Sequence, residues 1–227
     1  MEDINKIKKL SIWIFFVPFI AINVCLILIT NFHQLFNLEH VVLPTIPYID
    51  GGVSISRTAR VFPTYLIFKP AMFITAFFLI KYWRFNSGLM GKISPYPNYK
   101  KFFLFFGIGS AIFLVLHSIF LGIKFDNNFY KLFRRVLVLA FIIFEIIAQT
   151  ILVINFFKIK EQMKQFINSR ILYFKIILVS ILVVVAFVSI PFLAAEGYNS
   201  FKHALEWNYF VGVISFYLLT FFFWKKQ

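Results

Sequence analysis

The sequence predicts an all-α integral membrane bundle of six transmembrane helices. Three observations predict it: hydrophobic residues make up 61% of the 227 residues, charged residues make up only 14%, and the apolar residues fall into six long runs. A soluble domain has about 25% charged residues, which is well above the value for this chain. Spans and loops use nearly all of the sequence, so we interpret residues 1–227 as a single membrane domain.

Each of the six runs approaches the length that a bilayer requires. About 20 mostly apolar residues in a helix cover the ~30 Å hydrocarbon core, and a helix pairs its backbone groups without help from water. The predicted spans are residues 10–30, 63–80, 102–123, 136–157, 176–195 and 207–224.

The first two spans have recognisable boundaries. No small-residue cleavage site follows the first span at Asn31, Phe32 and His33, so we interpret this span as a retained anchor. The second span begins at Pro63, where the missing N–H of proline costs nothing in the first turn of a helix. The stretch 31–62 between the two spans is the longest predicted loop.

Glycines shape the region around the third span. Gly107 and Gly109 lie inside this span, and small residues there predict a close approach by a neighbouring helix. Gly88 and Gly91 precede it, and they favour a loop over residues 81–101. The later spans are joined by shorter loops, so we expect neighbouring helices to pack antiparallel.

Basic residues gather in the loops on one side of the predicted membrane. With the N-terminus inside, 14 Lys and Arg residues flank the inner ends of the spans and 7 flank the outer ends. The positive-inside rule therefore predicts that both termini are cytoplasmic, although the sequence does not identify the membrane. A net charge of +14 would suit nucleic acid, but this distribution suits anionic headgroups, so we expect membrane lipids and no nucleic acid as partners.

Glu145 is the acidic residue at the middle of the fourth span. A charge at that depth costs ~2.5–3.5 kcal/mol on insertion scales, so Glu145 should face the bundle interior, with Gln149 on the same helix face. Lys69, near the middle of the second span, is its predicted ion-pair partner, and His117 in the third span is the alternative. Such a pair would either handle lipid or protons, or lock the helices together.

A second group of polar residues lies at the outer ends of the spans. We expect five of them to meet a lipid headgroup: Asp50, Arg57, Arg60, His203 and Glu206. The two arginines suit a phosphate, because the guanidinium fork matches its geometry. Histidine and carboxylate can also bind a metal, but tight ligand spacing is missing and the chain has one cysteine, so we expect no metal and no cofactor.

Two stretches of the chain resemble a known family. One lies in the first outer loop and the other opens the sixth span. The matching residues are Pro47, Tyr48, Ile49, Asp50, Glu206 and Trp207. With the six spans and the long first loop, these motifs are similar to the Frag/DRAM/Sfk family of six-span membrane proteins. The resemblance implies a role in lipid remodelling of GPI anchors, phospholipid asymmetry or autophagy control, and it transfers no catalytic set.

The leading functional prediction is a multi-pass membrane protein that binds or helps remodel lipid at the outer leaflet. We favour a protein that is not an enzyme, because the standard catalytic motifs are missing. A membrane-embedded lipid acyltransferase or hydrolase is one alternative, with His117 or His203 as the base, oriented by Glu145 or Glu206. A small proton-coupled transporter that uses Glu145 is the other.

The three functions predict different structures. An enzyme requires a histidine in hydrogen-bond reach of a carboxylate, in a pocket open to the outer leaflet. A transporter requires a polar path that crosses the midplane past Glu145. A lipid-binding protein requires neither of these features, but it does require a lateral groove at the outer leaflet.

Overall fold

The structure is a computed structural model of the chain, and it describes residues 2–93, 97–123 and 128–225. Within these residues it is helical, and six helices are long and apolar enough to cross a membrane. The predicted all-α class with six candidate spans is therefore confirmed. The six helices are α1 Glu2–Asn31, α3 Tyr65–Ile93, α4 Pro97–Phe120, α5 Asn128–Lys158, α6 Ser169–Ala194 and α7 Asn199–Phe223. Three short helices lie between α1 and α3: η1 His33–Leu35, η2 Leu38–His40 and α2 Ile55–Ala59.

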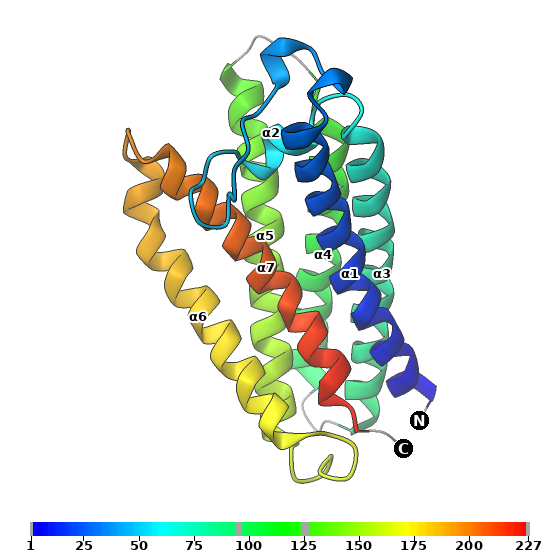
Figure 1. Cartoon of the computed structure of the whole chain (residues 1–227). Coiled ribbons are helices and arrows are strands. Elements are labelled where there is room, and N and C mark those ends of the chain that lie inside the picture. Colours follow the sequence, from blue (N-terminus) through cyan, green and yellow to red (C-terminus); the bar gives the residue numbers. More distant parts are fainter. Residues whose placement is uncertain (1, 94–96, 124–127, 226–227) are drawn as a thin grey trace.

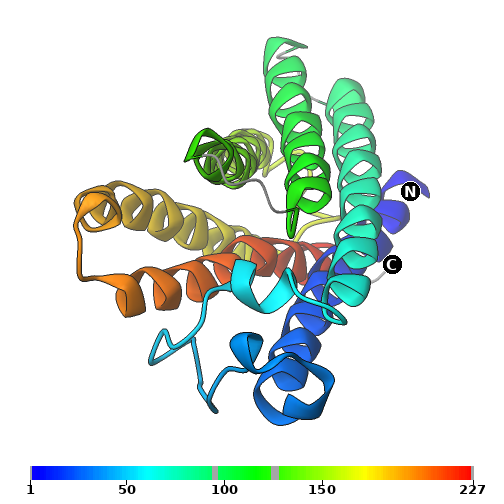
Figure 2. The same ribbon diagram turned by 90° about the horizontal axis from the view of Figure 1, so that it is seen from above.

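The helices pack side by side as one bundle (Figure 1 and Figure 2). α3 lies between α1 and α4, α5 packs on α4, and α7 packs on both α1 and α6. Both ends of the chain lie at one end of the bundle, which we call the terminal end. The opposite end, which carries the long segment 32–64, is called the loop end.

Most helices extend beyond the predicted spans. α1 begins at Glu2 rather than residue 10, α5 at Asn128 rather than residue 136, and α7 at Asn199 rather than residue 207. The predicted spans ended where the apolar residues ended. Backbone hydrogen bonds, however, carry a helix on past its last apolar residue, because polar and charged side chains are tolerated at headgroup depth.

The prediction of a loop over residues 81–101 was wrong for the first half of this range. α3 continues through Gly88 and Gly91 to Ile93. A single glycine costs a helix only about 1 kcal/mol, which the packing of α3 against two neighbours outweighs. Pro97 then opens α4, at the position where proline is best tolerated.

The predicted close approach at the glycines of α4 is confirmed. A Cβ atom on Gly107 would overlap the Trp83 side chain of α3, and one on Gly109 would overlap the Phe144 ring of α5. These contacts hold α4 tightly between its two neighbours. They also bring Ser110, the next residue of α4, against the centre of α5.

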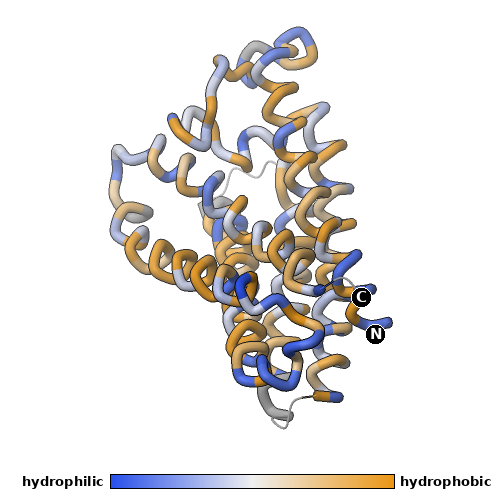
Figure 3. The backbone as a smooth tube through the Cα atoms, turned by 60° about the horizontal axis from the view of Figure 1, so that its bottom comes forward, coloured by the Kyte–Doolittle hydropathy of each residue, from blue (hydrophilic) through white to orange (hydrophobic). Residues whose placement is uncertain are grey.

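α6 is the least buried of the six candidate spans. Only 22% of its most apolar stretch is buried, against 44% in α3. Its exposed side chains include Ile177, Ile181, Phe187 and Val188. Apolar residues run along the helices while hydrophilic ones gather at their ends and in the loops (Figure 3). Such an apolar outer surface is suited to contact with lipid chains.

Candidate functional site

Glu145 is buried at the centre of the bundle, where it accepts hydrogen bonds from three helices. Ser110 Oγ on α4 donates at 2.6 Å and Gln149 Nε2 on α5 donates at 3.0 Å. The Tyr217 hydroxyl on α7 donates the third bond. The interior position of Glu145, with Gln149 beside it, is therefore confirmed. Three neutral donors satisfy the carboxylate oxygens in place of the expected cation.

The predicted ion pair between Lys69 and Glu145 was wrong. Lys69 Nζ donates to the Ile119 carbonyl at 3.3 Å and lies 5.7 Å from the centre of the Tyr65 ring. Ile119 is in the last turn of α4, where carbonyls lack a partner within the helix and a positive charge is favourable. Lys69 therefore stabilises the end of α4 at the loop end, away from the bundle centre.

Lys175 on α6 is a buried lysine that was not among the predicted site residues. It is 0% exposed, and its Nζ donates to Thr220 Oγ1 at 2.8 Å and lies 3.9 Å from the centre of the Phe216 ring. The Thr220 hydroxyl donates to the Phe216 carbonyl. The Tyr82 hydroxyl, 3.3 Å from Thr220 Oγ1, is consequently the donor in that contact.

Glu145 and Lys175 belong to one polar cluster along α7, which we call the polar seam. Tyr217 bonds Glu145 and Thr220 bonds Lys175, and the two α7 residues are three positions apart on one helix face. The Tyr82 and Tyr217 rings are in edge contact at 4.9 Å and connect the two halves. The members of the seam are Tyr82, Ser110, Glu145, Gln149, Lys175, Tyr217 and Thr220.

A second polar cluster lies at the loop end, where the long segment is bound to the start of α7. We call it the loop latch, made of residues 45–56 and 200–208. Trp207 Nε1 donates to the Val53 carbonyl at 2.8 Å, and Trp207 is fully buried. His203 Nδ1 lies 2.9 Å from the Gly51 carbonyl, so this nitrogen carries the proton. His203, which was predicted at a lipid headgroup, and Trp207, which was predicted as part of the family motif, thus both bind the loop backbone.

Tyr48 and Asn208 extend the latch. Asn208 Nδ2 donates to the Tyr48 carbonyl at 2.7 Å, and the Tyr48 ring makes an edge contact with Trp207 at 5.0 Å. The Tyr48 hydroxyl donates to Asn23 Oδ1 of α1 at 3.0 Å. The structure therefore brings together the two stretches on which the family resemblance rests, and Tyr48 connects them to α1.

The two predicted carboxylates of this region also face the backbone. Glu206 is bonded by the N–H groups of Ile55 and Ser56, at the start of α2. Asp50, in contrast, shapes the loop itself.

Asp50 closes the turn in which it lies. Its carboxylate accepts from the Thr45 hydroxyl, from Ile46 N at 2.9 Å and from Gly52 N at 2.8 Å. These hydrogen bonds, that of Thr45 above all, lower the pKa of the Asp50 carboxyl below its ordinary value. Asp50 is thus an internal support of the loop, with its acceptor positions occupied.

Arg57 and Arg60 remain available for an external partner. Both are exposed, at the end of α2. Partial burial, followed by the charges of Arg134 and Arg57, lowers the pKa of Arg60. The charges of Arg57 and Arg134 therefore both act on Arg60, and none of the three guanidinium groups forms an ion pair within the described part of the chain. We call Arg57, Arg60 and Arg134 the basic cluster.

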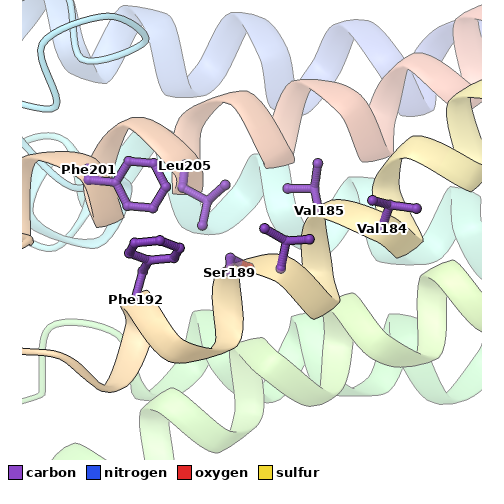
Figure 4. Close-up of a pocket in the computed structure, with 7 residues that line it drawn as sticks. Val184, Val185, Ser189, Phe192, Phe201 and Leu205 are labelled. Carbon is purple, nitrogen blue, oxygen red and sulfur yellow. The ribbon is translucent and has the colours of Figure 1, made fainter.

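An apolar groove opens between α6 and α7 at the loop end (Figure 4). Its volume is about 270 Å³. The Phe192 and Phe201 rings lie 5.4 Å apart at one end of it. The lining residues are Val184, Val185, Val188, Ser189, Phe192, Phe201 and Leu205. The Ser189 hydroxyl donates to the Ala186 carbonyl of its own helix, so the groove offers apolar contacts almost exclusively.

The catalytic arrangement required of an enzyme is not formed by the predicted bases. His203 is bonded to a backbone carbonyl. His117 Nδ1 is buried, and no hydrogen-bond partner for it occurs among the described residues. Neither histidine lines the α6–α7 groove. In the same residues, no group of three or more His, Cys, Asp or Glu is placed to hold a metal ion.

Comparisons of the chain with protein-family models, with curated proteins and with solved structures gave no match. The resemblance to the Frag/DRAM/Sfk family stays a prediction.

Proposed function

We propose that this is a multi-pass membrane protein that binds an anionic phospholipid at its loop end, with an acyl chain in the α6–α7 groove. The groove is the observation that carries this proposal. It opens sideways between two candidate spans, and its one polar lining residue is satisfied within its own helix. In a bilayer, hydrocarbon fills such a groove without stranding any polar group.

The basic cluster supports an anionic headgroup. Arg57 and Arg60 are exposed beside Arg134, and like charges held together favour a bound anion. Guanidinium groups match the oxygen geometry of a phosphate. Of the five residues first expected at the headgroup, only the two arginines are free of the loop latch.

The loop end belongs to the outer leaflet in this proposal, and both termini are cytoplasmic. The loop presents Leu43, Ile46 and Ile49, which are 79%, 61% and 81% exposed. Apolar side chains at the tip of a loop are stabilised when they dip into the interface. A cysteine placed at exposed Asn37, in a Cys25→Ala background, should therefore react with an impermeant thiol reagent added to intact cells. Reaction only after the cells are opened would reverse the orientation.

Photo-crosslinking tests the groove directly. Purified protein in nanodiscs is irradiated with a phospholipid that carries a diazirine in its acyl chain, and the labelled peptides are identified by mass spectrometry. We expect label on 184–192 and 201–205, and we expect Val188→Trp to remove most of it by filling the groove. Ile181→Trp is the matched control, because Ile181 is an exposed residue of the same helix outside the groove. Equal label in both variants would contradict the proposal.

The headgroup is tested by changing lipid charge. Wild type should retain more phosphatidylglycerol than phosphatidylcholine through purification, and Arg57→Gln with Arg60→Gln should abolish this preference. Arg84→Gln, at the terminal end, should keep it. If all three proteins retain the two lipids equally, the anionic part of the proposal fails while the groove result stands by itself.

A further inference from the structure

We infer that the polar seam is a hydrated proton-binding site, in which Glu145 exchanges protons with the terminal side of the membrane and not with the loop side. This inference does not depend on the proposed lipid site, which lies at the other end of the bundle. It assigns to the seam a ligand class, protons carried by bound water.

The first support is the direction in which the seam runs. From Glu145, the contacts pass to Tyr217, then to Tyr82, and then to Thr220 with Lys175. Thr220 follows Tyr217 on α7, which runs toward the terminal end, so the series ends closer to that end than Tyr217. At that end, Lys8 Nζ donates to the Trp224 carbonyl at 3.2 Å.

The second support is a set of buried polar atoms on the same side of Glu145. Gln149 Oε1, Asn86 Oδ1, Asn155 Nδ2 and Trp224 Nε1 are buried, and none has a hydrogen-bond partner in the described part of the chain. On the loop side the same holds for His117 Nδ1 and Arg134 Nε, but an apolar layer separates these two atoms from Glu145. A buried polar group without a partner costs about 1–3 kcal/mol. Bound waters are common partners of such groups in protein interiors. Water along these atoms would connect Glu145 to the terminal side.

The third support is the apolar layer on the loop side of Glu145. Leu114 follows Ser110 by one turn of α4, and Phe141 precedes Glu145 by one turn of α5. Leu114 and Leu137 are buried, 6% and 4% exposed. The next ionisable groups in that direction, His117 and Arg134, lie beyond this layer. A proton path through it would need polar side chains that these positions do not supply.

The groups that face Glu145 define how it titrates. α7 contributes Tyr217, α3 contributes Tyr82, and α6 contributes Lys175 through Thr220. α4 and α5 contribute Ser110 and Gln149, which do not titrate. The titratable groups of the seam are therefore the Glu145 carboxyl, the Lys175 amine and the hydroxyls of Tyr82 and Tyr217. A proton from water adds to the carboxylate and later returns to water, and no other bond is made or broken.

Infrared difference spectroscopy of the full chain in nanodiscs tests whether Glu145 exchanges protons. We expect a carboxyl band that grows on acidification of the wild type and is absent from Glu145→Gln. Glu196→Gln is the matched control, because Glu196 is an exposed carboxylate near the loop end, and this variant should keep the band. The inference would be overturned if the wild type shows no pH-dependent carboxyl band, or if Glu145→Gln keeps that band.

The side of access is tested by the rate at which the band follows a pH jump. Asn155→Leu should slow this rate by about tenfold or more, which corresponds to a barrier raised by ~1.4 kcal/mol. Asn86→Leu should act in the same direction and serves if Asn155→Leu does not fold. His117→Leu and Ser118→Ala, on the loop side, should leave the rate unchanged. Slowing by the loop-side variants, or an unchanged rate in the asparagine variants, would overturn the proposed access.

Discussion

The loop latch and the polar seam both rest on α7, yet they satisfy their polar groups differently. In the latch, Trp207, His203 and Asn208 donate hydrogen bonds to backbone carbonyls of the loop. In the seam, side chains from several helices bind one another. A backbone carbonyl is present whatever residue carries it. The latch is therefore sensitive to substitution on α7 and tolerant in most of the loop, whereas the seam is sensitive at both partners of each contact.

The largest expected effect is at Trp207. Trp207→Ala should lower the free energy of unfolding by about 3–5 kcal/mol, because a large buried ring is lost and the Val53 carbonyl loses its donor. Denaturant unfolding in detergent micelles measures it. Trp13→Ala is the control, because Trp13 is 56% exposed on α1 and should be nearly neutral. Equal losses in the two variants would mean that the latch does not stabilise the bundle.

Glu145 gives the next largest effect. Glu145→Leu should cost about 2 kcal/mol, because Ser110, Gln149 and Tyr217 lose their acceptor. The two bonds that join different helices are worth about 0.6 kcal/mol each on average, with larger values when partners are stranded. Glu145→Gln keeps one acceptor oxygen and should cost less. Glu161→Leu, at an exposed position, should change little. If Glu145→Leu and Glu145→Gln lower the free energy of unfolding equally, the hydrogen bonds accepted by the Glu145 side chain do not stabilise the seam.

Gly51 is the exception to the tolerance of the loop. Its φ is +62°, and a Cβ there would overlap the Ser200 backbone. Gly51→Ala should therefore cost at least about 1–2 kcal/mol, which is the cost of the left-handed backbone before the overlap with Ser200 is added. Gly88→Ala is the matched control with the opposite sign. Gly88 lies inside α3 with open space around it, so alanine should stabilise by up to about 1 kcal/mol. Thermal unfolding of both variants in detergent measures these two changes in stability.

Asp50 should give the smallest effect, and it depends on pH. Its pKa is lowered from an ordinary value near 3.8, mainly by the Thr45 hydrogen bond. Its stabilisation of the loop is therefore fully present above that ordinary value and is lost as the pH falls through the lower folded-state pKa. At neutral pH, the Gly52 and Ile46 amides should exchange hydrogen faster in Asp50→Asn than in wild type. The two proteins should converge in strong acid, and a difference that persists there would contradict this role.

The interior of the bundle was only half predictable. The cost of a charge in hydrocarbon required Glu145 to face inward, and the structure places it there. Its partner could not be predicted from depth, because two residues at similar depth contact each other only if their helices are neighbours and turned toward each other. Lys69 is turned to the end of α4, and Lys175, at the edge of a predicted span, enters the seam instead.

The loop end shows the same limit. The sequence marked Asp50, His203 and Glu206 as polar groups at a membrane surface, where a headgroup was a reasonable partner. The structure gives each of them a backbone partner within the chain. Every residue carries backbone groups, so the residue pattern does not indicate which backbone group a side chain will bind. The α6–α7 groove could not be predicted from the sequence either, because it depends on the distance between the two helices.

The sequence by itself determined the helical class of this protein, the number of its candidate membrane spans and the inward position of Glu145. These features follow from the free energy of placing apolar and charged groups in hydrocarbon, which each segment carries independently of its neighbours. Only the tertiary structure decided which side chains meet: Glu145 with Tyr217, Lys175 with Thr220, and the loop with α7. Contacts depend on the rotation and spacing of helices, which arise from packing the whole bundle at once.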